Sequence, residues 1–361
     1  MHIFRKHGYQ TAGFVSGPFL HPVFGFDQGF DAYHYCTSNP EAVSLIEKHP
    51  ISEEAQFASD KDITCPQVNS AVLPWLEKNG GKPFFLFIHY FDVHYDYIPP
   101  PPYVRMFDPA YKGTITTENF IKDDRINDSL PERDIDHIVA RYDGEIRFTD
   151  DHLGSVIGKL KALGLSENTL IIITSDHGDE FFEHGGKGHA HTLYDELIKI
   201  PLIMHFPEKI PAGSKIANQV RIIDIMPTIL DICGLPPSKE QMGTSLLPLI
   251  QGKRSDYGLM NLAELYIQGH AQVSLRTNKW KVIFNHNTSQ PYFYDLKKDP
   301  EEQNGILLTP SNPNYKKVRV LFRMGRNAFK SGERLSRSTD EGQRKLDPQT
   351  LERLRSLGYI E

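Results

Sequence analysis

Two continuous apolar segments, separated by a long amphipathic pattern, constrain the fold of this chain more than any other feature. Residues 83–90 and 169–174 each have the composition of a strand buried on both faces, which is typical of a parallel sheet. Between them, apolar residues recur at three- and four-residue spacing over 135–163, which predicts a helix that ends at Gly164. A strand, a long crossover helix and a second strand form a βαβ unit. We therefore expect an α/β fold, with a mostly parallel sheet flanked by helices.

Shorter patterns add elements to this unit. Further strands are predicted at 11–15 and 201–206, and we expect them in one sheet with the two apolar segments. Helices are predicted at 69–79 and 222–233.

The chain changes character after residue 254. Beyond this point the strand-like segments are short and bounded by turn residues, at 272–276, 279–284 and 292–296. Such segments are typical of antiparallel sheets, and a helical pattern ends the chain. We therefore predict two domains, a large α/β domain over 1–254 and a small C-terminal antiparallel-sheet subdomain over 255–361.

Charge and composition exclude several classes of function. The formal net charge of -6 and the absence of Lys/Arg clusters argue against a nucleic-acid surface. No apolar run is long enough to span a membrane, and the start, MHIFRKHGYQT, lacks the apolar core of a signal peptide. The compartment therefore stays open. Cys36, Cys65 and Cys233 form no CxxC pair, so no structural zinc site is indicated.

Asp176 and His177 directly follow the predicted strand at 169–174. Ligands of open α/β sheets bind beyond the carboxyl ends of the strands, so both side chains can turn into one cleft. A carboxylate oxygen and an imidazole nitrogen together suit a divalent metal. Gly178 allows the chain to turn sharply at this point. The alternative is an ordinary turn whose polar side chains are solvated.

A loop rich in glycine and histidine follows this pair. His184, His189 and His191 lie within eight residues of one another, and Lys187 is the one lysine among them. Such a loop can bring hydrogen-bond donors and positive charge close to an anion. A metal-binding tract and a plain surface loop are the alternatives.

The segment around these residues resembles the sulfatase family of the alkaline-phosphatase-like superfamily. The resemblance is most specific in the run SDHGDEFFEHGGKGHAHTLYDELIKIPLIMHFP at residues 175–207. Weaker similarities occur elsewhere, in the same order as in the family. Residues Gly8–Gly17 resemble its GYxTAxF strand, and Phe84–His94 resemble its FFLxxHxxDPH strand end. Two later segments, Arg276–Lys281 and Tyr294–Glu301, resemble its C-terminal motifs. The resemblance implies an alkaline-phosphatase-like fold.

The resemblance also implies roles for individual residues. Asp176 and His177 correspond to two metal ligands, and His94 to the histidine that binds the substrate anion. In the family, a lysine located shortly before the residue that corresponds to Tyr194 contacts the sulfate group. In this chain we assign that role to His189 or His191 first, and to Lys187 second.

The implied reaction is metal-dependent hydrolysis of a sulfate ester, on a small molecule or a glycan. Ca²⁺ is the expected metal, and Mn²⁺ or Zn²⁺ stay open because His177 replaces an asparagine found in many members. Phosphodiesters or phosphonates are an alternative substrate class within the superfamily. A non-catalytic relative that keeps the fold is the other alternative.

Two features of the family are not found at their expected place, ahead of the strand at 11–15. Its nucleophile is a formylglycine made in a C/S-x-P/A-x-R motif, and the residues after Cys36, Cys65 and Cys233 do not fit that motif. Its first strand ends in two aspartates, whereas the pairs at 123–124 and 150–151 follow a loop and a helical pattern. Both features normally precede the strand at which this chain starts, so we expect an N-terminally truncated sulfatase with doubtful activity.

Overall fold

The computed structural model describes residues 1–48, 63–238, 241–267, 270–285, 287–288, 290–312 and 315. These residues fall into two units that interleave along the chain. Unit 1 contains residues 1–166 and 181–188, and unit 2 contains residues 167–180 and the described residues from 189 onwards. Each unit is described by itself, and the domain boundary expected after residue 254 stays a prediction. The helix expected at the end of the chain lies outside the described residues.

The core of unit 1 is a three-stranded parallel sheet. Strand β1 (Gln10–Val15) lies at its centre, between β2 (Ala32–Tyr35) and β3 (Phe84–Ile88). The register pairs Gly13 with Tyr33 on one side and with Phe87 on the other. All residues of β1 from its second position onwards are buried, and both of its neighbours run parallel to it, which confirms a parallel sheet.

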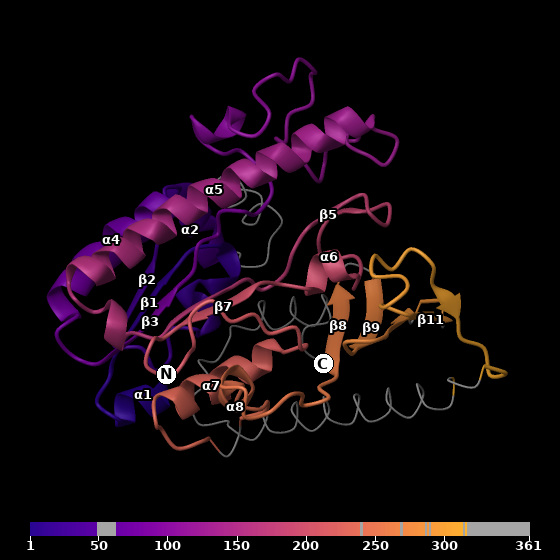
Figure 1. Cartoon of the computed structure of the whole chain (residues 1–361). Coiled ribbons are helices and arrows are strands. Elements are labelled where there is room, and N and C mark those ends of the chain that lie inside the picture. Colours follow the sequence, from indigo (N-terminus) through magenta and orange to yellow (C-terminus); the bar gives the residue numbers. More distant parts are fainter. Residues whose placement is uncertain are drawn as a thin grey trace. The chain divides into compact units, whose positions relative to one another are not determined.

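Helices cover this sheet, as Figure 1 shows for α4 (Cys65–Asn79) and the long α5 (Glu132–Ala162). Helix α4 packs on β1 and β3, and α5 packs on α4. The N-terminus of α4 is held by Asp92, whose carboxylate accepts from the N–H groups of Thr64 at 3.1 Å and Cys65 at 2.8 Å. A carboxylate is favourable there because the first N–H groups of a helix have no partner within the helix. Shorter helices are α1 (His2–Lys6) and α2 (Pro40–Lys48).

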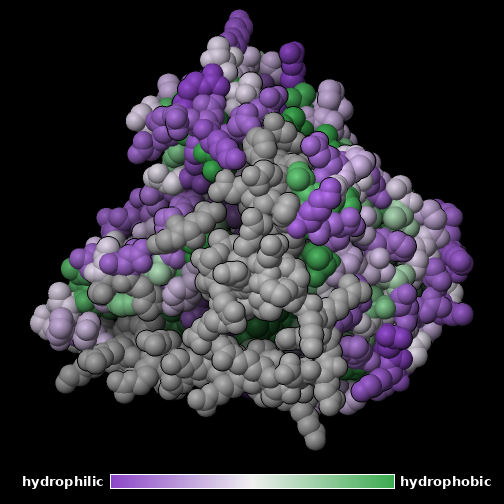
Figure 2. Space-filling view, turned by 180° about the vertical axis from the view of Figure 1, so that it is seen from behind, coloured by the Kyte–Doolittle hydropathy of each residue, from purple (hydrophilic) through white to green (hydrophobic). Residues whose placement is uncertain are grey.

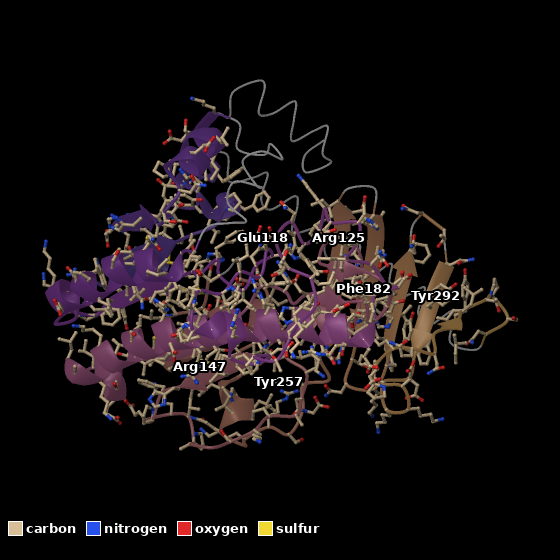
Figure 3. All side chains as sticks on the ribbon, turned by 90° about the horizontal axis from the view of Figure 1, so that it is seen from above. Glu118, Arg125, Arg147, Phe182, Tyr257 and Tyr292 are labelled. Atoms are coloured by element: carbon tan, nitrogen blue, oxygen red, sulfur yellow. The ribbon has the colours of Figure 1, made fainter. Side chains whose placement is uncertain are left out.

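The polar, Pro-rich excursion at 96–131 packs on α5 through a hydrophobic cluster. Its buried members are Tyr97, Ile115, Phe120, Ile126 and Ile138. Phe181 and Phe182 pack against the same cluster from residues 181–188. The excursion is therefore part of the fold of unit 1, and not a solvated loop. Figure 3 labels Glu118, Arg125 and Phe182 in this region.

Unit 2 contains a separate two-stranded sheet. Strand β4 (Ile171–Thr174) pairs antiparallel with β7 (Leu202–His205), with Ile172 opposite Met204. The expectation of one sheet was therefore wrong, because β3 and β4 belong to different hydrogen-bonded sheets. An apolar run predicts that a strand exists, but it carries no information on which strand pairs with it.

The burial predicted for the apolar segments was also wrong. Phe84–Ile88 is half-buried, with Phe87 38% exposed, and Ile171–Thr174 is also half-buried. The reason for Phe84–Ile88 is that β3 is an edge strand of the described sheet, whereas β1 has a neighbour on each side.

The helices of unit 2 are short. Helix α6 (Asp195–Ile198) precedes β7, a 3₁₀ turn over Ile222–Asp224 continues into α7 (Ile225–Ile232), and α8 (Leu247–Ile250) follows. The helix predicted at 222–233 is thus confirmed, with a tighter first turn. Among the described residues, no helix combines the length and hydropathy needed to cross a bilayer.

The C-terminal part of unit 2 is a five-stranded antiparallel sheet in the order β12-β11-β10-β9-β8. Its strands are β8 (Asn261–Ile267), β9 (His270–Arg276), β10 (Lys281–Asn285), β11 (Gln290–Tyr294) and β12 (Ile306–Leu307). The small antiparallel sheet is confirmed, and β8 is a strand that the sequence patterns missed.

A buried ionic network fixes this sheet to helix α6. The ammonium group of Lys281, 0% exposed, lies 3.1 Å from Asp195 and 2.9 Å from Glu302. Arg276 completes the network with a 2.6 Å contact to Asp195.

Elsewhere, large apolar side chains are exposed at scattered positions such as Ile306. Figure 2 shows green hydrophobic groups between purple hydrophilic ones on the face it presents, which is ordinary for a protein surface.

Candidate metal centre

The turn after β4 carries Asp176 and His177, and its path is set by Gly178. The N–H of Gly178 donates to the carbonyl of Leu197 at 2.9 Å. A Cβ atom at Gly178 would lie 2.1 Å from the carbonyl oxygen of Glu196, so only glycine fits where the turn meets α6. Close backbone approach therefore explains the glycine after the Asp-His pair.

The tautomer of His177 is fixed by its own turn. Its Nδ1 lies 2.9 Å from the carbonyl oxygen of Gly178, and a carbonyl can only accept. In the neutral ring, Nδ1 therefore carries the proton and Nε2 has the lone pair. That Nε2 lies 3.8 Å from Oδ2 of Asp176, whose side chain is 77% exposed. The two predicted metal ligands thus offer a nitrogen and an oxygen close together.

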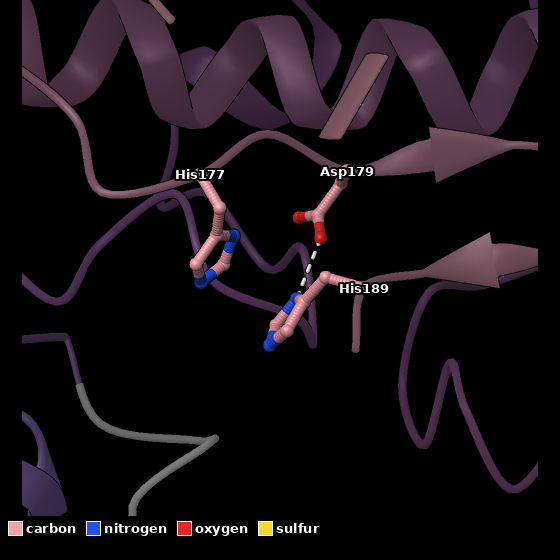
Figure 4. A group of neighbouring side chains, drawn as sticks. All are labelled: His177, Asp179 and His189. Atoms are coloured by element: carbon pink, nitrogen blue, oxygen red, sulfur yellow. Dashed lines mark hydrogen bonds and ion pairs between the residues drawn. The ribbon is translucent and has the colours of Figure 1, made fainter. Parts of the chain in front are cut away.

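His189 is oriented by a carboxylate in the same way. Its Nδ1 lies 2.7 Å from Oδ1 of Asp179, whose side chain is 4% exposed (Figure 4). In the neutral ring the proton again lies on Nδ1, which leaves the lone pair on Nε2. The rings of His177 and His189 are 4.1 Å apart. Ligand atoms of His177, Asp179 and His189 all lie within 4.8 Å of one another.

His191 is paired with a different carboxylate. Its Nε2 lies 2.7 Å from Oε2 of Glu180, whose side chain is fully buried. The hydrogen bond to Glu180 raises the pKa of His191, and burial lowers it. The hydrogen bond is the larger effect, so the pKa lies above its ordinary value. The backbone carbonyl of His191 also accepts from Gln272 at 3.2 Å. His191 therefore carries positive charge more readily than an ordinary histidine.

Lys187 is engaged by backbone carbonyls of unit 1. It lies in β6 (Lys187–Gly188), which pairs with β5 (Glu180–Phe181). Its ammonium group donates to the carbonyls of Asp123 at 2.9 Å and Ile126 at 2.6 Å. Lys187 thus holds the excursion in place, and its predicted contact with a substrate stays a prediction.

His94 lies in unit 1, in the loop that follows β3. Its ring stacks on Phe91 at 4.3 Å and on Tyr95 at 4.2 Å. Its Nδ1 lies 2.6 Å from the carbonyl oxygen of Tyr95. Asp176 belongs to unit 2, so the predicted convergence of His94 with the metal-binding pair stays a prediction.

Asp179 and Glu180 are the residues that sequence reasoning missed. They directly follow the Asp-His-Gly turn, and each pairs with a histidine of the later loop. The sequence signal that could have indicated these pairs was two adjacent acidic residues followed, about ten residues later, by two histidines. Strand alternation could not assign the pairs, because Ala190 adopts a φ of 67° between the two histidines and breaks the extended geometry.

This arrangement fits a divalent metal ion. Histidines that ligate metals generally donate their other ring N–H to a carboxylate or a backbone carbonyl, which fixes the ring. His177 and His189 have these two kinds of partner. Mixed imidazole and carboxylate donors suit Mn²⁺ or Zn²⁺, whereas Ca²⁺ prefers oxygen ligands.

Comparison with known families finds two matching profiles. The profile described as Sulfatase matches residues 1–235, and that of the N-sulphoglucosamine sulphohydrolase C-terminal region matches residues 183–324. The two matches together extend from the first residue into the C-terminal sheet.

Individual relatives are similar over part of their length. Arylsulfatase K of Canis lupus familiaris is 36% identical over 185 residues, 48% of this chain and 34% of that protein. An N-acetylglucosamine-6-O-sulfatase of Bacteroides thetaiotaomicron is 29% identical over 176 residues, 46% of this chain and 31% of that protein. The match thus spans about a third of these curated relatives. The solved phosphonate monoester hydrolase of Agrobacterium radiobacter has a TM-score of 0.66 and 20% identity, and the match covers 91% of this chain and 79% of that one. This likeness shows that the chain has the alkaline-phosphatase-like fold.

Proposed function

Since the chain belongs to the sulfatase family, we propose that its His177 cluster binds a divalent metal ion that serves sulfate-ester hydrolysis. The observation that carries the proposal is the pair of imidazole rings of His177 and His189. Each ring donates from Nδ1 to a fixed acceptor, so each offers Nε2 to a metal. Asp176 supplies an oxygen donor 3.8 Å from Nε2 of His177, and Asp179 lies in the same cluster.

The identity of the metal follows from the donors. Ca²⁺ is the expectation from the family, and the exposed carboxylate of Asp176 suits it. Two imidazoles within one cluster favour Mn²⁺ or Zn²⁺ instead. We therefore propose a site that accepts a transition-metal ion at least as well as Ca²⁺.

The chemistry divides between the metal and the protein. A bound metal would polarise the oxygen atoms of the ester. His191, whose pKa is raised by the hydrogen bond to Glu180, would stabilise the charge that develops on the sulfuryl group and the leaving oxygen, whereas His189, held by Asp179, would ligate the metal through Nε2. His94 would contribute to anion binding, as the family motif implies.

A sulfated sugar is the proposed substrate class. The relative from Bacteroides thetaiotaomicron is an N-acetylglucosamine-6-O-sulfatase, and the second matching profile is that of an N-sulphoglucosamine sulphohydrolase. Both names refer to sulfate groups on glucosamine units. A divalent metal also suits a phosphonate or phosphodiester, which the assay below separates from a sulfate ester.

Metal binding is the first test. The chain of 361 residues, freed of metal with a chelator, is titrated with Ca²⁺, Mn²⁺ and Zn²⁺ while thermal unfolding is followed. We expect the metal to raise Tm, because an ion that binds only the folded state stabilises it. The His177→Ala variant should lose this increase. The matched control is His205→Ala, which removes an exposed histidine of β7 and should keep it.

An equal metal effect in all three proteins would overturn the proposed site. Substrate class is tested next, by measuring the affinity of the metal-bound protein for inorganic sulfate, phosphate and methylphosphonate. Preference for phosphate or methylphosphonate over sulfate would favour the phosphonate hydrolase alternative over the sulfatase.

A further inference from the structure

The loop from Phe91 to Ile98 adopts a strained conformation next to His94. Val93, the residue before His94, has a φ of 77°. This left-handed conformation is unusual for any residue except glycine, and it is a pronounced outlier for a β-branched one. Such strain persists only where the surroundings over-determine the backbone, and it concentrates at functional sites.

Hydrogen bonds hold the loop at both ends. At its start, the N–H of Phe91 donates to Ser16 Oγ at 2.8 Å, and Asp92 accepts from the N–H groups at the start of α4. Farther on, Oδ1 of Asp96 accepts from the N–H of Phe120 at 2.7 Å. The strained residue therefore lies between two anchored segments.

Helix α5 holds the end of the loop through two side chains. Oε1 of Glu145 accepts from the N–H of Ile98 at 2.6 Å. Arg141, one turn earlier, donates from Nε and Nη2 to the carbonyl of Tyr97, each at 3.2 Å. The helix thus binds both polar groups of the peptide bond between Tyr97 and Ile98.

Glu145 is unusual among these anchors. It is 7% exposed, and besides the N–H of Ile98 the backbone of Val93 interacts with its carboxyl group. Burial raises the pKa of Glu145 well above its ordinary value, against the hydrogen bond from Ile98, which lowers it. A buried carboxyl group of this kind costs stability, so its presence calls for a role that an apolar residue could not fill.

We infer that Glu145 is a positioning residue for His94: it holds the strained loop so that the ring stays between Phe91 and Tyr95 with Nδ1 bonded to the Tyr95 carbonyl. This orientation leaves the lone pair of the neutral ring on Nε2. The inference rests on the proposed function insofar as His94 binds the sulfate group.

The test compares three variants of the full chain. Glu145→Gln keeps the length and an acceptor for the N–H of Ile98, and it is neutral, like the acid with a raised pKa. Glu145→Ala removes the acceptor. The matched control Asp143→Asn makes a similar change two residues earlier on α5, at a side chain that makes no hydrogen bond to the loop among the described residues.

The first readout is the tautomer of His94, measured from its ring ¹⁵N shifts by two-bond ¹H–¹⁵N correlation and assigned with His94→Gln. Wild type, Glu145→Gln and Asp143→Asn should show the Nδ1–H tautomer. Glu145→Ala should show averaged ring nitrogens, because its loop is released. A wild-type pattern in Glu145→Ala would overturn the inference. If that variant does not fold, Glu145→Asp, which withdraws the acceptor by one methylene, decides the question in the same way.

The second readout is the affinity for inorganic sulfate. Glu145→Ala should bind sulfate roughly tenfold more weakly than wild type, as expected for loss of a hydrogen bond that orients the binding group, and Glu145→Gln should restore most of the affinity. If His94→Gln binds sulfate as tightly as wild type, the proposed anion-binding role of His94 fails. The tautomer pattern still decides the positioning role in that case, so the two failures are distinguishable.

Discussion

Nδ1 of His189 lies 2.7 Å from the buried carboxylate of Asp179, and this contact determines what the His-rich loop can do. The carboxylate accepts a hydrogen bond from the Nδ1–H of the ring, which leaves the second nitrogen to act as a ligand or a hydrogen-bond partner. It also fixes the ring beside His177, at a centroid distance of 4.1 Å. The metal binding that we propose for the cluster thus depends on a residue that does not belong to the Asp-His pair of the turn.

Replacement of Asp179 by Asn should weaken metal binding by roughly 10- to 100-fold, because partners of metal-ligating histidines typically contribute this much. The asparagine keeps the size of the side chain but removes the acceptor charge that fixes the ring. The affinity for Mn²⁺ is measured by isothermal titration. Glu180→Gln, which changes the neighbouring pair with His191, is the comparison variant. A larger loss in Glu180→Gln than in Asp179→Asn would assign the site to His191.

Replacement of Gly178 by Ala should destabilise the chain by about 3 kcal/mol, because its Cβ would lie 2.1 Å from a backbone oxygen that cannot move cheaply. The control is Gly158→Ala on α5, where nothing lies within 4 Å of the added atom. That change should leave stability equal or raise it by up to about 1 kcal/mol, since alanine favours helices. Urea unfolding monitored by circular dichroism measures both. Equal stability of the two variants would contradict the tight turn.

The sequence was sufficient to predict the presence of most elements, because apolar periodicity reflects local burial. It predicted α4 and α5 closely and the parallel character of the sheet around β1. It could not predict that β4 pairs with β7, because pairing depends on residues distant along the chain. Strand β2 was missed for a related reason: its four residues include polar and aromatic side chains without a clear pattern.

The candidate site was predictable in part. Asp176, His177 and His189 were expected from their types and order, and the structure brings His177 and His189 together. Asp179 was not expected, because a carboxylate after a turn is common and its partner follows ten residues later. The positive φ of Ala190, which sends His189 and His191 to different carboxylates, has no signature in the sequence.

Asp195 should make stability depend on pH at the acidic end. Burial raises its pKa, but the hydrogen bond from Arg276 and the charge of Lys281 outweigh this effect, so the pKa is lowered. A lowered pKa means that the stabilisation is fully present above the unfolded value of about 3.9 and is lost as the pH falls through the folded value. The free energy of unfolding of wild type relative to Asp195→Asn should therefore decrease below about pH 4.

The control for this pH effect is Asp143, whose pKa is raised by burial. The sign is then reversed: wild type should gain stability relative to Asp143→Asn as the pH falls. Denaturant unfolding between about pH 3 and pH 7 measures both differences. A difference between wild type and Asp195→Asn that does not change with pH would contradict the depressed pKa of Asp195.

These 361 residues alone should not turn over sulfate esters above background. The family reaction needs a nucleophile that attacks sulfur, and no cysteine here stands in the motif that supplies it. The run Ser129-Leu130-Pro131-Glu132-Arg133 fits the motif by letter, but it lies at the start of α5 and not ahead of β1, where the family has its nucleophile. Loss of a covalent nucleophile commonly costs several orders of magnitude in rate. An aryl sulfate and an aryl phosphodiester are assayed with Ca²⁺ or Mn²⁺, with His177→Ala as the control. Metal-dependent turnover that this variant abolishes would show that another residue of the chain is the nucleophile.

The most direct test of the metal centre is pulsed electron paramagnetic resonance of the chain loaded with Mn²⁺, which detects nitrogen atoms bound to the ion. Coupling to imidazole ¹⁴N is the predicted result, because the rings of His177 and His189 each offer Nε2. The coupling should weaken in His177→Ala and in His189→Ala, and stay unchanged in His205→Ala. A signal without nitrogen coupling, or one that these two variants leave unchanged, would contradict a metal site at this cluster.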